Sequence, residues 1–217
     1  KTKFIYFSSS MIYGDFNEKE VDEETECKPK GIYGTMKYSG ELIIKSYSEV
    51  FDIDYTIIRP SALYGERCVS RRVTQVFIEN AIFSKDIVVT GNKEKEKLDF
   101  TYIDDLCQGV DLSIKKEGSK NQIFNITFGD GRSISELIDI LSNSFPNLKV
   151  IEKPRDKLVP IRGTLSIEKA KNVLGYKPKF NLEVGYKKYI AQGGDFGGVI
   201  STWLAYDFPK NLFGIHI

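Results

Sequence analysis

Short strands of buried type alternate with helical stretches along most of this chain, and this alternation limits its fold more than any other feature. The runs Phe4–Phe7 and Tyr55–Ile58 are aromatic or β-branched and bounded by turn residues, as expected of strands inside a parallel sheet. Between them, Tyr33–Val50 carries apolar residues at helical spacing, and Glu41 precedes Lys45 by four residues, the spacing of a helix-surface ion pair. Repeated strand–helix units predict an α/β fold with mostly parallel strands.

The alternation continues beyond the second strand. Further helices are expected over Thr74–Phe83 and Asp104–Ile114, and further strands at Ile87–Val89, Ile123–Ile126 and Val150-Ile151. Ser133 and Glu136 have the spacing of a capping box, which predicts a helix from there to about Leu141. Ser166 is expected to cap a last short helix that ends at Leu174-Gly175.

Charge and apolar patterning exclude several classes of partner. The 31 lysines and arginines nearly balance 30 aspartates and glutamates, and no basic stripe is interleaved with aromatic residues, so no nucleic acid partner is expected. The apolar runs are too short to span a bilayer, and no signal-peptide pattern opens the chain, so no membrane partner is expected.

Cysteine and histidine usage narrows the chemistry further. The three cysteines, Cys27, Cys68 and Cys107, are far apart and odd in number, which fits a reducing, cytoplasmic compartment better than a disulfide framework. The only histidine is His216, so we expect no metal site and no Ser-His-Asp or Cys-His arrangement.

A tyrosine and a lysine share one face of the first predicted helix. Tyr33 and Lys37 are four residues apart, a spacing that is common by chance. A lysine ammonium together with a nicotinamide cation favours the phenolate form of a neighbouring tyrosine. Such a tyrosine can take a proton from a sugar hydroxyl while hydride leaves the same carbon.

Three serines follow the first strand directly. Ser8–Ser10 lie where open α/β sheets bind ligands, so one of them could hydrogen-bond the reacting oxygen. The alternative interpretation is that the three serines merely form a turn.

Together these segments resemble the extended short-chain dehydrogenase/reductases, specifically their NAD-dependent nucleotide-sugar epimerases and dehydratases. The resemblance rests on S-S-S-M-I-Y-G at 8–14 and Y-G-T-M-K at 33–37. It implies that Ser9 and Tyr33 are catalytic, and that Lys37 assists Tyr33 and holds the nicotinamide ribose beside Ser8. Dehydratases carry acidic residues after the catalytic serine. This chain has Ser10 and then methionine there, which favours epimerisation or simple oxidation and places Ser10 near the substrate.

Two later segments extend the resemblance. Ile58–Gly65 is similar to R-P-x-N-x-Y-G, which implies that Pro60 and Ser61 lie against the nicotinamide. Ala62 replaces an asparagine that commonly contacts the sugar diphosphate. Leu98–Asp105 is similar to R-D-F-x-Y-V-x-D, but leucine replaces the substrate-side arginine and Lys97 is adjacent.

An arginine near the end of the matching region has two interpretations. Arg162 precedes a segment, Ser166–Pro178, that resembles the family's S-x-x-K-A-K-x-x-L-G-Y-x-P pattern. In relatives an arginine near this point can bind phosphate, because guanidinium pairs bidentately with phosphate oxygens. A solvated surface arginine is the alternative.

The resemblance spans about residues 1–190 and implies a partial, Rossmann-like parallel sheet with a small α/β substrate-binding lobe. The chain opens on Lys1, runs directly into a strand, and has no G-x-x-G-x-x-G before Tyr33, so we expect an N-terminally truncated domain that binds NAD poorly by itself. The family implies a homodimer in the intact protein. NADP in place of NAD stays open, because the discriminating acidic residue would precede this chain.

The tail, residues 191–217, has a different character. Gly193–Gly198 resembles the nucleophile elbow of α/β-hydrolase-fold epoxide hydrolases, with Asp195 as nucleophile. No histidine partner is available, so hydrolysis is not expected, and a glycine turn before a helix is the alternative. Gly185–Ile190 fits either the last helix of an epimerase or the strand that leads to the elbow. Two coding segments joined by fusion or assembly error would explain both resemblances.

The predicted function is NAD-dependent epimerisation of a nucleotide-activated sugar through a transient keto intermediate. Two alternatives stay open: an NAD(P)-dependent sugar-ketone reductase, and a non-catalytic binding member of the same fold. The sugar, the nucleotide and the inverted carbon are not determined by the sequence.

Overall fold

Three parallel strands form the central sheet of the molecule. The computed structural model describes residues 3–68 and 70–192. Within them, β1 (Lys3–Phe7), β3 (Asp54–Arg59) and β8 (Gln122–Asn125) lie in the order β1-β3-β8. Phe7 is opposite Ile58, and Arg59 is opposite Asn125, so the three carboxyl ends meet at one edge. The segments that follow these strands therefore emerge side by side.

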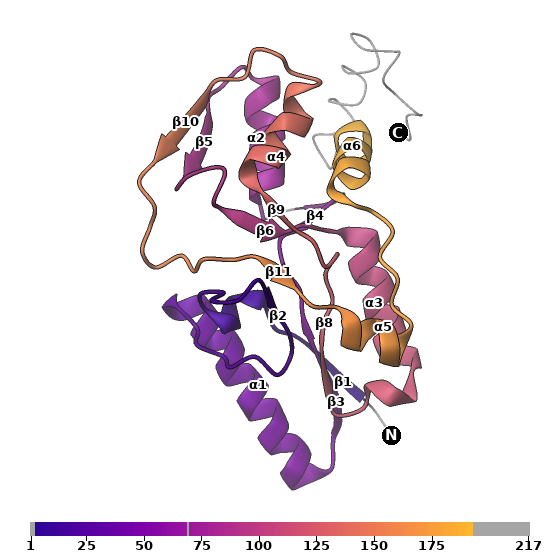
Figure 1. Cartoon of the computed structure of the whole chain (residues 1–217). Coiled ribbons are helices and arrows are strands. Elements are labelled where there is room, and N and C mark those ends of the chain that lie inside the picture. Colours follow the sequence, from indigo (N-terminus) through magenta and orange to yellow (C-terminus); the bar gives the residue numbers. More distant parts are fainter. Residues whose placement is uncertain (1–2, 69, 193–217) are drawn as a thin grey trace.

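Helices cover both faces of this sheet. Figure 1 shows α1 (Gly31–Phe51) on one side, and α3 (Ile103–Lys115) with α5 (Glu168–Leu174) on the other. The α3 and α5 side is a closed apolar core. It contains Ile58, Leu106, Phe124, Ile126, Ile167, Ala170, Leu174 and Tyr176. Each large aliphatic side chain buried there contributes about 1.5–3 kcal/mol to folding.

A second, smaller lobe lies beyond the carboxyl ends of the strands (Figure 1). It comprises the helices α2 (Val73–Ile82), α4 (Ile134–Ser142) and α6 (Leu182–Gln192), the parallel pair β5 (Ile87–Thr90) and β10 (Val150–Lys153), and the antiparallel pair β6 (Lys97–Asp99) and β9 (Gly131–Ser133). Its core includes the fully buried Leu137 and Tyr186. The expected α/β fold, with a mostly parallel sheet and a small α/β lobe, is confirmed.

The remaining elements are short. They are the 3₁₀ helices η1 (Ser10–Tyr13) and η2 (Glu117–Ser119), and the parallel pairs β2 (Glu20–Val21) with β11 (Thr164–Leu165) and β4 (Leu63–Tyr64) with β7 (Thr101–Tyr102). The β11–β2 pair brings the chain back from the lobe to the sheet. None of the helices in the described ranges 3–68 and 70–192 is long and apolar enough to cross a membrane.

The sequence predicted two helix ends correctly and one incorrectly. The capping box is confirmed, because Ser133 accepts from the Glu136 amide while Glu136 accepts from the Ser133 amide. Gly175 adopts the left-handed conformation, φ 74°, that ends α5. The predicted Ser166 cap is wrong, because α5 is preceded by Ile167 without a side-chain cap, and the Ser166 amide instead donates to the Val21 carbonyl.

Near the C-terminus, Gly185–Ile190 lies in helix α6 and not in a strand. This agrees with the epimerase interpretation of that stretch. The hydrolase-like segment Gly193–Gly198, with Asp195, lies outside the described residues.

Candidate active site

The serine segment runs along the end of β3. The Ser8 amide donates to the Ile58 carbonyl at 2.8 Å, and the Ser10 amide donates to the Pro60 carbonyl at 2.9 Å. Ser9 caps η1, and its Oγ accepts from the Met11 amide at 3.2 Å. Because Ser9 Oγ acts there as an acceptor, its own hydrogen remains available to donate to a ligand oxygen.

The hydroxyl of Ser8 is buried and has no hydrogen-bond partner among the described residues. Leaving such a group unsatisfied costs about 1–3 kcal/mol, so a bound polar group beside it would recover a contact. Ser8 lines the pocket described below, where this hydroxyl is a candidate contact for a polar ligand group.

Tyr33 and Lys37 lie together beside the end of β1. The ammonium nitrogen of Lys37 is 5.9 Å from the centre of the Tyr33 ring and donates to the Phe7 carbonyl at 2.7 Å. Tyr33 is 50% exposed and lines the same pocket as the serines, so its side chain does not point into packed core. A Cβ on Gly34 would lie 2.7 Å from the Met11 carbonyl oxygen, so glycine here lets α1 approach η1 closely.

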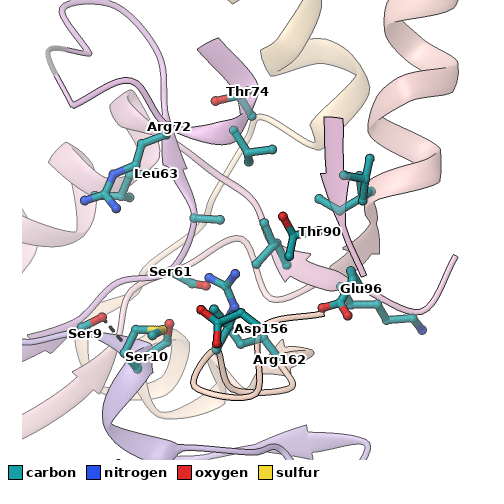
Figure 2. A pocket seen from close by; sticks show the side chains of 18 of the residues that line it. Ser9, Ser10, Ser61, Leu63, Arg72, Thr74, Thr90, Glu96, Asp156 and Arg162 are labelled. Carbon is teal, nitrogen blue, oxygen red and sulfur yellow. Dashed lines mark hydrogen bonds between the residues drawn. The ribbon is translucent and has the colours of Figure 1, made fainter. Parts of the chain in front are cut away.

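A pocket of about 600 Å³ lies between the sheet and the lobe (Figure 2). Most of the residues singled out from the sequence line it, namely Ser8, Ser9, Ser10, Tyr33, Pro60, Ser61, Ala62 and Arg162. The lobe contributes apolar wall from α2, β5 and β6. Lys37 is not among the lining residues and contacts the site through Tyr33.

Arg162 is a partly buried cation in the pocket wall. No hydrogen bond or ion pair of its guanidinium is found within the described part of the chain. Burial lowers the pKa of Arg162 to about 10, with Glu96 acting against this and Arg155 and Arg72 adding to it. Arg162 is therefore cationic at neutral pH and lacks a carboxylate partner, as expected of an anion-binding group. Its partial burial in the pocket wall favours the anion-binding interpretation over that of a solvated surface residue.

A family model matches this chain. The model described as NAD dependent epimerase/dehydratase family matches residues 1–127, more than half of the chain. The chain belongs to this epimerase/dehydratase family.

Individual members of the family agree with this assignment. UDP-glucuronic acid 4-epimerase from Bacillus cereus, in complex with UDP-glucuronic acid and NAD, superimposes with a TM-score of 0.81 at 27% identity, over 86% of this chain and 60% of that one. UDP-glucose 4-epimerase from Thermotoga maritima, with UDP-glucose, gives a TM-score of 0.80 at 28% identity, over 86% of this chain and 62% of that one.

A relative found by sequence gives the same result. UDP-glucuronate 4-epimerase 1 from Arabidopsis thaliana is 31% identical over 86% of this chain and 47% of its own length. The chain thus spans about half to three fifths of the relatives that it matches.

This epimerase/dehydratase chain departs from its family's pattern at two pocket positions. Leu98 stands where an arginine was expected, and its side chain is 5% exposed and packs into the lobe core. Ala62 stands where an asparagine was expected and leaves only a methyl group at the pocket wall. The cations that line the pocket are therefore Arg72, Lys97, Arg155 and Arg162.

Several residues of the pocket were not predicted from the sequence. Arg155 bonds Glu96 at 2.6 Å and the carbonyls of Val159 and Pro160 at 2.9 and 3.0 Å, which ties down the segment that leads to Arg162. The hydroxyl of Thr74, at the start of α2, is buried and unpartnered among the described residues. Arg71 and Arg72 directly precede α2, and this pair was the sequence signal for a cationic helix start.

Within residues 3–68 and 70–192, no group of three or more histidine, cysteine, aspartate or glutamate side chains is placed to hold a metal ion.

Proposed function

We propose that the complete protein that carries this chain epimerises a nucleotide-activated sugar at carbon 4, using NAD and a transient keto intermediate. The observation that carries this proposal is the single pocket that Ser8–Ser10, Tyr33 and Arg162 share. The reaction type and the carbon are supported by relatives that are named as UDP-glucose and UDP-glucuronate 4-epimerases.

In this proposal Tyr33 takes the proton of the 4-hydroxyl, and Ser9 donates a hydrogen bond to the same oxygen. Lys37, 5.9 Å from the Tyr33 ring, stabilises the negative charge that develops on the phenol oxygen. The sugar is then a ketone that turns within the pocket, so that hydride would return to the opposite face of its carbon while Tyr33 returns the proton to its oxygen. An apolar lobe wall favours this turn, because it makes few directional contacts with the sugar.

NAD would lie with its nicotinamide end against residues of this chain. Bound NAD supplies hydride acceptance from the sugar carbon and hydride return to it. Ser8, Tyr33, Lys37, Pro60 and Ser61 would hold that end, and the unsatisfied Ser8 hydroxyl fits a polar cofactor group. NADP is an alternative that a cofactor comparison would decide.

The nucleotide diphosphate would lie on the lobe side of the pocket. Arg162 is a partly buried pocket cation with no carboxylate hydrogen bond or ion pair in the described part, and guanidinium matches phosphate geometry. Ser10 and Ala62 would border the sugar between Arg162 and the catalytic residues.

The test is a panel of UDP-, GDP- and CDP-sugars incubated with the complete protein and NAD. We expect an epimer to form from one nucleotide class without net NADH. Stoichiometric consumption of NADH or NADPH would instead indicate a sugar-ketone reductase. Tight substrate binding without any turnover would indicate a non-catalytic member of the family.

A homodimer that uses α1 is also part of the proposal. Five apolar residues recur along the outer face of this helix and are 57–80% exposed, namely Ile32, Met36, Ile43, Tyr47 and Val50. A contiguous apolar stripe of this kind is typical of an interaction surface. Light scattering of the complete protein should give twice the mass of one protomer. The Ile43→Glu variant should give the mass of a single protomer.

The boundaries of the chain's parts and its cellular location remain proposals as well. A junction near residue 190 between the epimerase/dehydratase part and a hydrolase-like tail is supported by relatives that match 86% of the chain. Resequencing the coding locus would test the junction. A cytoplasmic location is supported by three free cysteines, and tagging the complete protein in its host would test it.

A further inference from the structure

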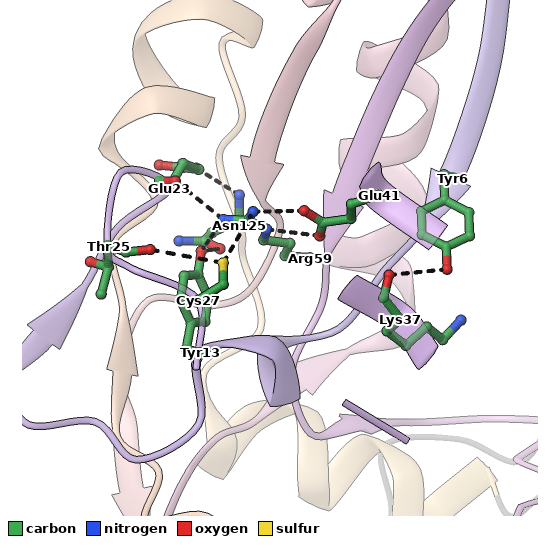
Figure 3. Close-up of polar contacts among 9 residues, drawn as sticks. All are labelled: Tyr6, Tyr13, Glu23, Thr25, Cys27, Lys37, Glu41, Arg59 and Asn125. Carbon is green, nitrogen blue, oxygen red and sulfur yellow. Dashed lines mark hydrogen bonds and ion pairs between the residues drawn. The ribbon is translucent and has the colours of Figure 1, made fainter. Parts of the chain in front are cut away.

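A buried ion pair joins α1 to the central sheet. Arg59 on β3 donates from Nε and Nη2 to the two carboxylate oxygens of Glu41 at 3.0 and 2.7 Å (Figure 3). The two side chains are 3% and 0% exposed. Glu41 therefore does not form the surface pair with Lys45 that the sequence predicts, because its carboxylate faces inward to Arg59.

The Arg59 guanidinium also contacts Tyr13, in the 3₁₀ helix that follows Ser9. Its Nη1 donates to the Tyr13 hydroxyl oxygen at 2.9 Å, and its Cζ lies 5.0 Å from the centre of the Tyr13 ring. The Tyr13 hydroxyl in turn donates to Asn125 Oδ1 at 2.8 Å, and Asn125 Nδ2 donates to the Ser166 carbonyl at 3.1 Å. One hydrogen-bonded series thus joins α1, β3, the end of η1, β8 and the segment after β11.

Glu41, Tyr13 and Arg59 lie close in sequence to predicted site residues, and Arg59 directly precedes Pro60. Glu41 follows Lys37 by one helical turn and Tyr33 by about two. Tyr13 ends the 3₁₀ helix that Ser9 caps. Because a helix is rigid over two turns, fixing Glu41 restrains Tyr33, and fixing Tyr13 restrains the short 3₁₀ helix that Ser9 caps.

Besides Glu41, α1 is held by the bond from Lys37 to the Phe7 carbonyl and by Tyr38, which packs partly buried beside Tyr13. Of its 21 residues, only Gly34 and Glu41 are buried, and the apolar stripe of Ile32, Met36, Ile43, Tyr47 and Val50 faces away from the sheet. Gly34 sets how closely α1 approaches η1, but glycine has no side chain that could set the helix rotation. The bidentate contact to Glu41 is directional and supplies that restraint.

Stability alone does not account for such a pair. Desolvation of two charges commonly offsets their attraction, and apolar replacements of buried ion pairs are often neutral or stabilising. Burial raises the pKa of the Tyr13 hydroxyl, so this group stays a neutral donor to Asn125 over the working pH range.

We propose that Arg59, Glu41 and Tyr13 are positioning residues that set the rotation of α1 against the serine segment, and thereby hold Tyr33 in register with Ser9. This inference rests on the proposed epimerase function, and it concerns alignment and not substrate contact. A misalignment of about 1 Å at a reacting group can lower a rate by about 100-fold. The expected signature is a loss in kcat with little change in KM.

The test compares variants of the complete protein. Arg59→Met with Glu41→Leu removes both charges together, so we expect an unfolding midpoint equal to or above that of the wild type. We expect its kcat to fall by about 10- to 100-fold and its KM to change less than about threefold. Arg132→Met is the matched control, because Arg132 bonds Glu136 and Glu183 outside the pocket, and its kcat should be unchanged. A stable double variant with wild-type kcat overturns the proposal.

Two further variants keep the test decisive if the double variant does not fold. Glu41→Gln preserves shape and one acceptor, and Tyr13→Phe preserves the ring, so both should fold and lose kcat about tenfold with KM retained. Wild-type kcat in both overturns the proposal.

Crystal structures separate this inference from the proposed reaction. We expect the Tyr33 hydroxyl in the Glu41→Gln variant to be displaced from Ser9 by about 1 Å or more, whatever reaction the wild type catalyses. Superimposable Tyr33 and Ser9 positions overturn the positioning role. Failure of the wild type to epimerise any sugar, with the displacement present, overturns only the proposed function.

Discussion

Asp99 is a fully buried carboxyl at the junction of sheet and lobe, and its titration should be visible in the stability of this chain. One carboxylate oxygen accepts from the Thr127 hydroxyl at 3.0 Å and the Leu165 amide at 3.1 Å, and the other accepts from the Gly129 amide at 3.2 Å. Burial nevertheless raises the pKa of Asp99 to about 7, the three donors oppose this, and Asp130 adds to it.

The magnitude follows from the difference in pKa between the folded and unfolded states. The shift from the ordinary value of 3.8 to about 7 spans roughly three units, which corresponds to about 4 kcal/mol. Between these two pH values the folded state retains a proton that the unfolded state has lost. The contribution of Asp99 to the free energy of unfolding is therefore greatest below pH 3.8. It decreases as pH rises and is lost above about pH 7.

The assay is denaturant unfolding of the wild type and Asp99→Asn from pH 4 to 8. The asparagine cannot accept from all three donors, which costs about 1–3 kcal/mol at every pH. Because the asparagine does not titrate, the free energy of unfolding of the variant, relative to that of the wild type, should rise by about 4 kcal/mol from pH 4 to pH 8. Parallel stability curves, or a wild type that gains on the variant as pH rises, would refute the assignment of a raised pKa.

Three further predictions address the core, the substrate and the cofactor. Leu137→Ala should lower the free energy of unfolding by about 2–5 kcal/mol, whereas the half-exposed Val184→Ala should change it by less than about 0.5 kcal/mol, both measured by denaturant titration. Arg162→Leu should raise KM for the nucleotide sugar by about tenfold or more in the complete protein, because a charge-assisted contact to phosphate is lost; an unchanged KM would exclude Arg162 from the substrate site. Calorimetric titration of NAD into this chain alone should show no micromolar binding, because in the proposed site its residues would contact only the nicotinamide end; micromolar affinity would contradict this.

Features that depend on one stretch of sequence were predictable. The alternation of strand and helix signals predicted the parallel sheet, and the Ser133 and Glu136 spacing predicted the start of α4. Tyr33 and the three serines converge on one pocket because the carboxyl ends of β1 and β3 meet at one sheet edge.

Features that depend on tertiary contacts were not predictable. The spacing of Glu41 and Lys45 indicates a surface pair, but nothing local shows that Arg59 comes to face Glu41 from β3. Ser166 has the residue type of a cap, yet strand pairing with β2 uses its backbone first. Thr74 and Glu96 join the pocket only because the lobe folds over the sheet.

The most direct measurement of the central claim is the rate of epimer formation by the complete protein with Tyr33→Phe, beside Tyr55→Phe as a control that removes a phenol hydroxyl from outside the pocket. The account predicts a loss of about 10²- to 10⁴-fold in kcat for Tyr33→Phe, with KM nearly unchanged, and no loss for Tyr55→Phe. A Tyr33→Phe enzyme that retains the wild-type rate would contradict it.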